Sequence, residues 1–370
     1  MSDPAILLLE DGRRFAGLSI GASGTTFGEV VFKTSMTGYQ EVLTDPSYAG
    51  QIVVMTAPMI GNYGVNADDV ESAAVQVEGF VVRELPEVYS SWRAEGGLGR
   101  YLDDAGVVAI ADVDTRALTR HIRSQGAMRA AVTTELGDDE ALLERIRAQP
   151  RMKGLDLACT VSTKEAFTVP SKGETRFRVA AFDMGVKSRS LDLLAERGCE
   201  VRVFPSGAGA AEVFATQPHG LFVSNGPGDP SSVESALETI RACGGQNVPV
   251  FGICLGQQLV ARAYGGSTYK LLYGHRGGNH PVRRLDDGAV EITAQNHGFA
   301  VEGSEEGVPG APDLQVTHIN LNDGTVEGVA HREEPVFAVQ YHPEGAPGPH
   351  DSHYLFDRFI KAMERRAGRA

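Results

Sequence analysis

The segment PVFGICLGQQLVARAYGG, from Pro249 to Gly266, decides the fold of the C-terminal half of the chain. An apolar run ends at Cys254 and an amphipathic run begins at Leu255, which predicts a strand, a sharp turn and a helix. Gly252 and Gly256 flank the cysteine in the pattern of the nucleophile elbow G-x-S-x-G, with sulfur in place of oxygen. Such a turn needs small neighbours, because the chain passes close to adjacent backbone there. The segment therefore predicts a cysteine nucleophile at the end of a strand, where the first turn of the helix favours a thiolate.

The sequence around this segment alternates short apolar runs with helix-like stretches. RFRVAAFDMG, CEVRVFP, GLFVSN and VPVFGI are typical of strands, and VKSRSLDLLAERG, AAEVFATQ and SSVESALETIRACGG of helices, the last capped by Ser231 or Ser232. Strands separated by helices of this length form right-handed crossovers and a parallel sheet covered on both faces. We therefore expect an α/β domain over residues 176–370, with a mostly parallel sheet flanked by helices.

The N-terminal half has a different pattern. The runs EVVFKTS, QIVVMTA and VQVEGFVV resemble strands between Gly, Asn and Pro turns, and DTRALTRHIRSQG resembles a helix capped by Asp114 and ended by Gly126. Residues 1–150 are therefore expected to form a mixed, β-rich domain. Residues 151–175 lose periodicity and gain Ser, Thr, Lys and Pro, which predicts a linker. Near the C-terminus, one buried stripe is expected on a final helix, formed by Leu355, Phe359 and Met363.

Composition narrows the classes of partner. The 370-residue chain has a formal net charge of -14, so nucleic acid and anionic membrane surfaces are disfavoured as partners. No apolar run is long enough to cross a membrane, and the acidic N-terminus MSDPAILLLEDGRR lacks the basic region of a signal peptide. The four cysteines show no C-x-x-C spacing, which suits a reducing compartment. We expect a cytoplasmic protein.

A base for the cysteine is predicted in PVFAVQYHPEG, where an apolar strand leads to His342. In extended chain, Glu344 lies on the same side as the histidine, so its carboxylate can approach the imidazole. Cys254, His342 and Glu344 then form a candidate triad, with histidine as acid and base and glutamate fixing its tautomer. No fuller cluster of metal ligands is evident, so no metal is predicted.

Each of these features has a simpler interpretation. A cysteine beside a strand is often a small buried hydrophobe, His-Pro-Glu is often a polar turn, and the NGPGDP stretch can be only a tight turn. The chain also lacks the G-x-x-x-x-G-K-[ST] and G-x-G-x-x-G phosphate-binding patterns. The combination of the elbow with a distant histidine favours catalysis without a nucleotide bound to this chain.

The motifs NGPGDP, GICLGQQ and HPE, in this order on an α/β domain, resemble the class I glutamine amidotransferases. The stretch GEVVFKTSMTGYQEVLTDPSYAGQIVVMTAPMIGNYGVN resembles the N-terminal domain of the small, glutamine-hydrolysing subunits of carbamoyl-phosphate synthases. Together the two resemblances cover nearly the whole chain. Gln257 and Gly345 depart from the residues usual in these families, but neither is a triad member.

The resemblance implies a reaction and a set of site residues. Cys254 would attack the side-chain amide of L-glutamine, giving a γ-glutamyl thioester and ammonia, and water would then release glutamate. His342 would act as acid and base, supported by Glu344. The backbone N–H groups of Leu255 and Gly226 match the family's oxyanion-hole positions. The residues that match the positions holding the amino-acid end of glutamine are Ser47, Gly228, Gln258, Asn296, Gly298 and Phe299.

The resemblance also implies a partner, the large subunit of a carbamoyl-phosphate synthase. That subunit would use ammonia, bicarbonate and ATP with magnesium to make carbamoyl phosphate for arginine and pyrimidine synthesis, so no cofactor is expected on this chain. Three alternatives stay open: a glutaminase subunit of another synthetase, a catalytically silent regulatory module, and a cysteine peptidase. The segment TSMTGYQEVLTDPSY argues against the first, the intact triad against the second, and NGPGDP and QNHGF against the third.

Overall fold

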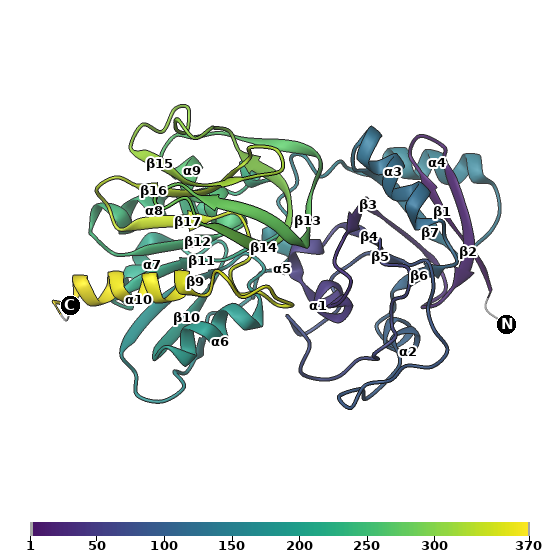
Figure 1. Cartoon of the computed structure of the whole chain (residues 1–370), viewed down its shortest axis with the longest axis horizontal. Helices are drawn as coiled ribbons and strands as arrows, with labels where there is room; N and C mark the ends of the chain where they lie inside the picture. The colour runs from purple at the N-terminus through teal and green to yellow at the C-terminus, as the bar shows by residue number, and fades with distance from the viewer. Residues whose placement is uncertain (1–2, 369–370) are drawn as a thin grey trace. The chain divides into compact units, whose positions relative to one another are not determined.

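A computed structural model describes residues 3–368 and divides the chain into two compact units (Figure 1). Unit 1 comprises Met1–Leu155 and Leu272–Gly277, and unit 2 comprises Asp156–Leu271 and Gly278–Ala370. Within residues 3–368, no helix combines the length and the apolar character that a membrane span requires.

Unit 1 is built on a closed barrel with the strand order β1-β2-β6-β5-β4-β3-β7. The pairs β3–β4, β4–β5 and β5–β6 are parallel and the other pairs are antiparallel, which confirms a mixed, β-rich domain. Closure leaves no unpaired edge. The strands are β1 (Pro4–Leu9), β2 (Arg14–Ser19), β3 (Thr25–Lys33), β4 (Gln51–Met55), β5 (Gly79–Val81), β6 (Val108–Ala111) and β7 (Met128–Thr133).

The helices of unit 1 are α1 (Tyr39–Thr44), α2 (Leu98–Asp104), α3 (Thr115–Gln125) and α4 (Asp139–Ala148). The ends of α3 confirm the sequence prediction. The carboxylate of Asp114 accepts a hydrogen bond from the backbone N–H of Ala117 at 2.9 Å, and Gly126 follows the helix with φ 97°.

A short segment from much later in the chain also belongs to unit 1. The backbone N–H of Ala127 donates to the carbonyl of Leu272 at 2.8 Å, and that of Thr34 donates to the carbonyl of Arg276 at 3.1 Å. Both acceptors lie on β13 (Thr268–Arg284). The sequence pattern did not predict this return of the chain, because a long strand carries no signal of the unit with which each part packs.

Unit 2 contains a ten-stranded sheet in the order β14-β13-β15-β16-β17-β12-β11-β9-β10-β8. The five central strands, from β17 to β10, are parallel, and antiparallel strands continue the sheet on both sides. Besides β13, the strands are β8 (Phe167–Val169), β9 (Phe177–Asp183), β10 (Cys199–Pro205), β11 (Gly220–Val223), β12 (Val250–Ile253), β14 (Val290–Val301), β15 (Leu314–Asn320), β16 (Val326–His331) and β17 (Val336–Val339).

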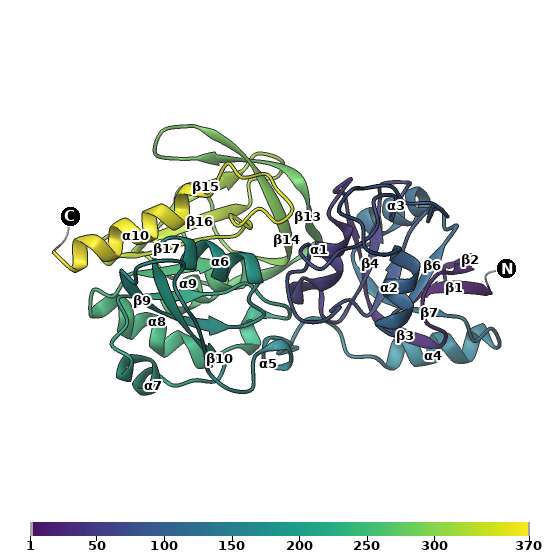
Figure 2. The same cartoon turned by 90° about the horizontal axis from the view of Figure 1, so that it is seen from below.

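Helices cover both faces of this sheet (Figure 2). Helices α7 (Ala210–Ala215), α8 (Ser235–Gly245) and α9 (Leu255–Ala263) share one apolar cluster with the sheet, and α6 (Ser188–Glu196) and α10 (Tyr354–Arg366) share the other. On β12, Val250 belongs to the first cluster and Phe251 to the second, as expected for a strand buried on both faces. The predicted stripe of α10 is fully buried, and the predicted α/β fold class is confirmed.

Two local expectations differ from the structure. The stretch 151–175, predicted to be a linker, contains α5 (Ala158–Val161) and the edge strand β8. Ser231 and Ser232 do not cap α8: they lie in a 3-10 helix that Asp229 caps through a 2.8 Å bond from the backbone N–H of Ser231. Asp229 followed by Pro230 is a stronger helix-start signal than either serine, and it begins the 3-10 helix. Because Val233 is extended, α8 begins only at Ser235.

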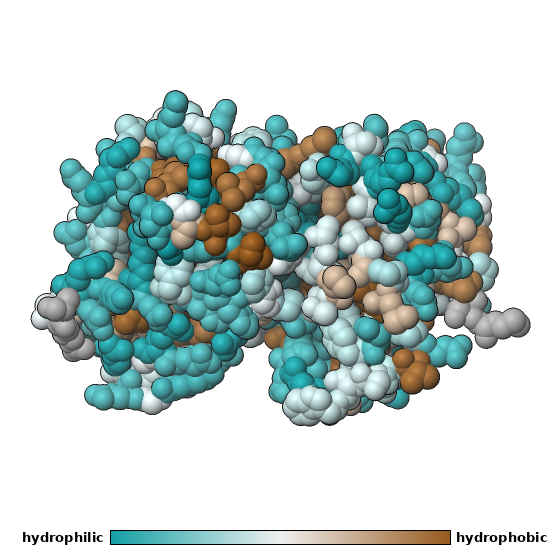
Figure 3. All heavy atoms as spheres, viewed as in Figure 1, coloured by the Kyte–Doolittle hydropathy of each residue, from teal (hydrophilic) through white to brown (hydrophobic). Residues whose placement is uncertain are grey.

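The surface of each unit is mostly hydrophilic on the face shown in Figure 3. Apolar side chains are nevertheless exposed at several positions of the described chain, which is ordinary for single residues. The largest of them is Trp92, at 94% exposure.

Candidate active site

The candidate nucleophile lies on a strained turn between β12 and α9. Cys254 has φ 54° and ψ -104°, a region that residues with a Cβ seldom adopt. Its backbone N–H donates to the carbonyl of Val339 on β17 at 2.8 Å, which fixes the turn to the neighbouring strand. The side chain is only 2% exposed. The strand, sharp turn and helix predicted from the sequence are all present.

The two flanking glycines are sterically required. A Cβ at Gly252 would lie 2.8 Å from the carbonyl carbon of Gly256, and a Cβ at Gly256 would lie 2.2 Å from the carbonyl oxygen of Val223. Real side chains do not approach backbone so closely. The G-x-C-x-G pattern is therefore explained by close packing of the turn on itself at Gly252 and against β11 at Gly256.

Parallel pairing brings the histidine to the same edge of the sheet as the cysteine. Strands β12 and β17 pair in parallel with Ile253 opposite Val339, so the residues that follow both strands emerge together. Nδ1 of His342 lies 2.7 Å from Oε1 of Glu344, and these residues are 3% and 0% exposed. The other ring nitrogen, Nε2, is buried and makes no hydrogen bond within residues 3–368.

The electrostatics of this group favour a charged histidine. Burial lowers the pKa of His342, but the Glu344 carboxylate and the Cys254 side chain outweigh it and raise this pKa to about 10. The Cys254 thiol donates to the carbonyl oxygen of Asn296 at 3.5 Å. The imidazole of His342 is therefore close enough to the sulfur of Cys254 for the sulfur to raise its pKa, and the carboxylate of Glu344 orients the ring.

Lys187, which was not predicted from the sequence, places a second positive charge beside the Glu344 carboxylate. Its ammonium lies 3.1 Å from Oε1 of Glu344 and donates to the carbonyl of Ala346 at 3.2 Å, and its side chain is 4% exposed. Burial raises the pKa of Glu344, but Lys187 and His342 outweigh burial and hold this pKa well below its usual range. One signal could have found this residue: Lys187 follows the carboxyl end of the parallel strand β9.

Two further histidines fix the backbone beside the carboxylate. Nε2 of His350 lies 3.0 Å from the carbonyl oxygen of Gly345, and Nε2 of His353 lies 3.2 Å from that of Glu344. These contacts hold the loop after β17, so the glutamate side chain keeps its direction toward the imidazole.

The predicted oxyanion-hole positions lie on two adjacent turns. Leu255 is the first residue of α9, so its N–H has no partner within the helix. Gly226 follows β11, and a Cβ there would lie 2.0 Å from the carbonyl oxygen of Met184. The Asn225 amide braces this turn by donating to the carbonyl of Gly185 at 2.8 Å. Gly228 has φ 92°, a conformation that favours glycine.

Four predicted glutamine-binding residues lie on α9 and β14. The amide nitrogen of Gln258 donates to the carbonyl of Phe299 at 2.8 Å and to Oε1 of Gln340 at 3.0 Å, so only its oxygen is left to meet a ligand. Asn296, Gly298 and Phe299 lie within four positions of each other on β14, where the Asn296 carbonyl accepts from the Cys254 thiol.

The remaining predicted binding residue, Ser47, belongs to unit 1. It lies in a 3-10 helix over Pro46–Tyr48, where its N–H donates to the carboxylate of Asp45 at 2.9 Å, and it is 5% exposed. Its role toward glutamine stays a prediction.

The arrangement in unit 2 is suited to acyl transfer. A thiol on a strained elbow, an imidazole fixed by a carboxylate, and a helix N-terminus beside the sulfur can together form and hydrolyse a thioester.

Comparison with known proteins agrees with this chemistry. The model of the carbamoyl-phosphate synthase small chain, CPSase domain, matches residues 7–132, and that of the class-I glutamine amidotransferases matches residues 180–362. A carbamoyl phosphate synthase small chain from Streptomyces avermitilis is 51% identical over 365 residues, covering 98% of this chain and 96% of the relative. Another, from Chlorobaculum tepidum, is 51% identical over 364 residues and covers 98% of both chains.

Among solved structures, a GMP synthase subunit from Thermoplasma acidophilum matches 52% of this chain and 96% of its own, with 21% identity and a TM-score of 0.43. That likeness is too low to support a conclusion, whereas the similarity to the small chains extends over nearly the whole sequence. The chain belongs to the family of carbamoyl phosphate synthase small chains and carries a class-I glutamine amidotransferase domain.

Proposed function

We propose that the chain hydrolyses L-glutamine through a covalent thioester on Cys254. His342 takes the thiol proton and holds it as imidazolium, and the sulfur then attacks the side-chain amide carbon. The imidazolium delivers this proton to the departing amine, so ammonia leaves. Water then attacks the γ-glutamyl thioester with His342 again as base, and glutamate is released with the thiol restored. In each half-reaction the same imidazole takes one proton and then returns it to the leaving group.

The supporting residues have distinct roles in this proposal. Glu344 fixes the tautomer of His342 and stabilises the imidazolium, and Lys187 keeps that carboxylate ionised. The N–H groups of Leu255 and Gly226 stabilise the oxyanion of the tetrahedral intermediates, each worth about 3–4 kcal/mol in such chemistry.

Binding of the amino-acid end of glutamine is assigned to the predicted set. The oxygen of Gln258 accepts from the substrate ammonium, because its nitrogen is already committed to Phe299 and Gln340. The other contacts in this proposal come from Ser47, Gly228, Asn296, Gly298 and Phe299.

The ammonia passes, in this proposal, to a carbamoyl phosphate synthase large subunit in the cytoplasm. That partner binds ATP, magnesium and bicarbonate and makes carbamoyl phosphate for arginine and pyrimidine synthesis, and this chain itself carries no metal or cofactor. Family membership supports the partner, since the relatives are named as small chains of this synthase.

The observation that carries the proposal is the 2.7 Å contact between His342 and Glu344 beside the strained Cys254. Cys254→Ser is expected to abolish glutamine-dependent carbamoyl phosphate formation by the complex with the large subunit. Formation from ammonium salts is expected to continue, because that route bypasses the thiol. Both rates are measured on the same reconstituted complex.

Cys159→Ser is the matched control, because Cys159 is exposed and far along the chain from the elbow. It is expected to keep both activities. Glutamine use by Cys254→Ser near the original rate would refute the assignment of the nucleophile, and loss of ammonia use as well would show that the variant disturbs the complex.

A further inference from the structure

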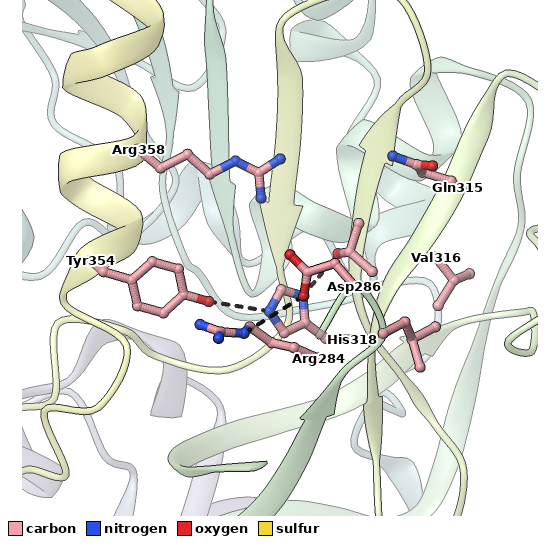
Figure 4. A pocket seen from close by; sticks show the side chains of 9 residues that line it. Arg284, Asp286, Gln315, Val316, His318, Tyr354 and Arg358 are labelled. Atoms are coloured by element: carbon pink, nitrogen blue, oxygen red, sulfur yellow. Dashed lines mark hydrogen bonds and ion pairs between the residues drawn. The ribbon is translucent and has the colours of Figure 1, made fainter. Parts of the chain in front are cut away.

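A second polar cavity lies in unit 2, outside the triad. It has a volume of about 390 Å³ and is formed by the end of β13, by β15 and by α10 (Figure 4). Its polar lining includes Arg284, Asp286, Gln315, His318, Tyr354 and Arg358. Both the volume and the convergence of polar groups are typical of small-molecule sites.

Arg358 is the unusual member of this lining. Its guanidinium makes no hydrogen bond or ion pair with any residue of 3–368, and it lies 4.3 Å from the centre of the Phe337 ring. Figure 4 shows the side chain extending from α10 into the cavity with no dashed contact. Burial lowers the pKa of Arg358 below its ordinary value, and Tyr354 and the Asp286 carboxylate offset this effect only in part.

The other arginine is already neutralised. Arg284 pairs with Asp287, lies 3.3 Å from Oε1 of Glu291 and lies 3.8 Å from Asp286. It therefore shapes the wall but offers no free charge. Arg358 is left as the one lining cation of this cavity without a carboxylate partner among the described residues.

The histidine of the wall is neutral and rigid. Burial, with Arg358 and Arg284 adding to it, lowers the pKa of His318 to about 3, and the residue is 3% exposed. Nδ1 of His318 lies 2.8 Å from the hydroxyl of Thr317, and Nε2 lies 3.4 Å from that of Tyr354. The ring thus adds no charge that would change with pH near neutrality, and it holds neighbouring hydroxyl groups in place.

We propose that this cavity, which we name the Arg358 pocket, binds the carboxylate or phosphate group of a small polar molecule. The planar guanidinium suits either oxyanion, because its N–H groups can donate two parallel hydrogen bonds. The bound oxyanion supplies the counterion that the folded chain lacks. Gln315 on the lining meets polar groups of the remainder of the ligand. The inference is independent of glutamine hydrolysis, since no triad residue lines the pocket.

Isothermal titration calorimetry of the full chain at constant ionic strength tests the proposal, with inorganic phosphate and succinate as probes. Saturable binding of at least one probe is expected, and binding of only one identifies the ligand as a phosphate or a carboxylate. Arg358→Gln is expected to weaken that binding by about tenfold or more, since it removes a charge-assisted pair. Arg116→Gln, at an exposed position of α3 in unit 1, is the matched control and is expected to bind as the parent does.

A second variant changes binding in the opposite direction. The Asp286 side chain is 83% exposed, so Asp286→Asn is not expected to disturb folding. Removing this carboxylate from the lining is expected to tighten phosphate or succinate binding by about threefold. No saturable binding of either probe, equal binding by Arg358→Gln and the parent, or weaker binding by Asp286→Asn would each overturn the proposal.

Discussion

Two cations of unit 2, the buried Lys187 and the half-buried Arg358, differ in what surrounds them. Lys187 has a carboxylate 3.1 Å away and a carbonyl 3.2 Å away, and that carboxylate in turn meets His342. Arg358 has an aromatic ring and no ionic partner among residues 3–368. Lys187 is part of an ion-pair and hydrogen-bond network with Glu344 and His342, and Arg358 lines a cavity that has room for a ligand.

The consequence of removing a cation depends on whether it has an ionic partner. A cation that is already paired contributes to the structure, so its removal leaves an uncompensated partner behind. A cation without a partner costs free energy in the folded state and is retained where something else supplies the counterion. The two sites should therefore respond in opposite ways to loss of charge and to added anions.

The largest effect is expected at Lys187. Lys187→Met leaves the fully buried Glu344 carboxylate without its ammonium, which is expected to lower the free energy of unfolding by about 3–5 kcal/mol. Urea denaturation at neutral pH measures this loss. The double variant Lys187→Met/Glu344→Gln is the control and should recover much of it, because no buried charge is then left alone. An unaffected single variant would mean that the ion pair contributes nothing.

A smaller effect on the free energy of unfolding, with a defined pH dependence, is expected at His342. His342→Asn removes a hydrogen bond to a charged group, a loss of about 1.5–3 kcal/mol in the free energy of unfolding near pH 6. The pKa of His342 is raised to about 10 in the folded chain, so the stability it contributes is complete below the unfolded pKa of about 6.5. That contribution is lost as the pH rises from about 6.5 to about 10.

The difference in unfolding free energy between the parent and His342→Asn should therefore shrink across this range. Urea denaturation at several pH values between about 6 and 10 gives the curve. A difference that grows with pH would contradict the assigned direction of the pKa shift.

The smallest effect is expected at Arg358 without ligand. Arg358→Met removes no hydrogen bond or ion pair, and only the contact with Phe337 is lost, so the free energy of unfolding should change by less than about 1 kcal/mol. Urea denaturation without added anions, beside Lys187→Met, makes the comparison direct. A loss as large as that at Lys187 would show that Arg358 has a structural partner.

The elbow and much of the triad could be predicted from the sequence, because the residues of each motif lie close together along the chain. Gly252 and Gly256 lie within two residues of Cys254, and Glu344 lies two residues from His342, so spacing alone places them. The meeting of the two segments follows from parallel strands ending at one edge, a rule that the alternating pattern makes available.

Other features depend on distant contacts that no local pattern carries. Lys187 pairs with a residue more than a hundred positions away, and Leu272–Gly277 joins unit 1 from the middle of a strand. The Arg358 pocket likewise combines three elements, and the missing partner of its arginine is visible only in three dimensions. The serine caps were wrongly predicted because Asp229 and Pro230 start an earlier turn.

The central claim is that the sulfur of Cys254 carries the glutamyl group during turnover. Rapid acid quenching of the complex during glutamine hydrolysis, followed by mass spectrometry of its peptides, tests it most directly. The account predicts a γ-glutamyl adduct on the peptide that contains Cys254, absent from Cys254→Ser. An adduct on another residue, or steady turnover by the Cys254→Ser complex, would contradict it.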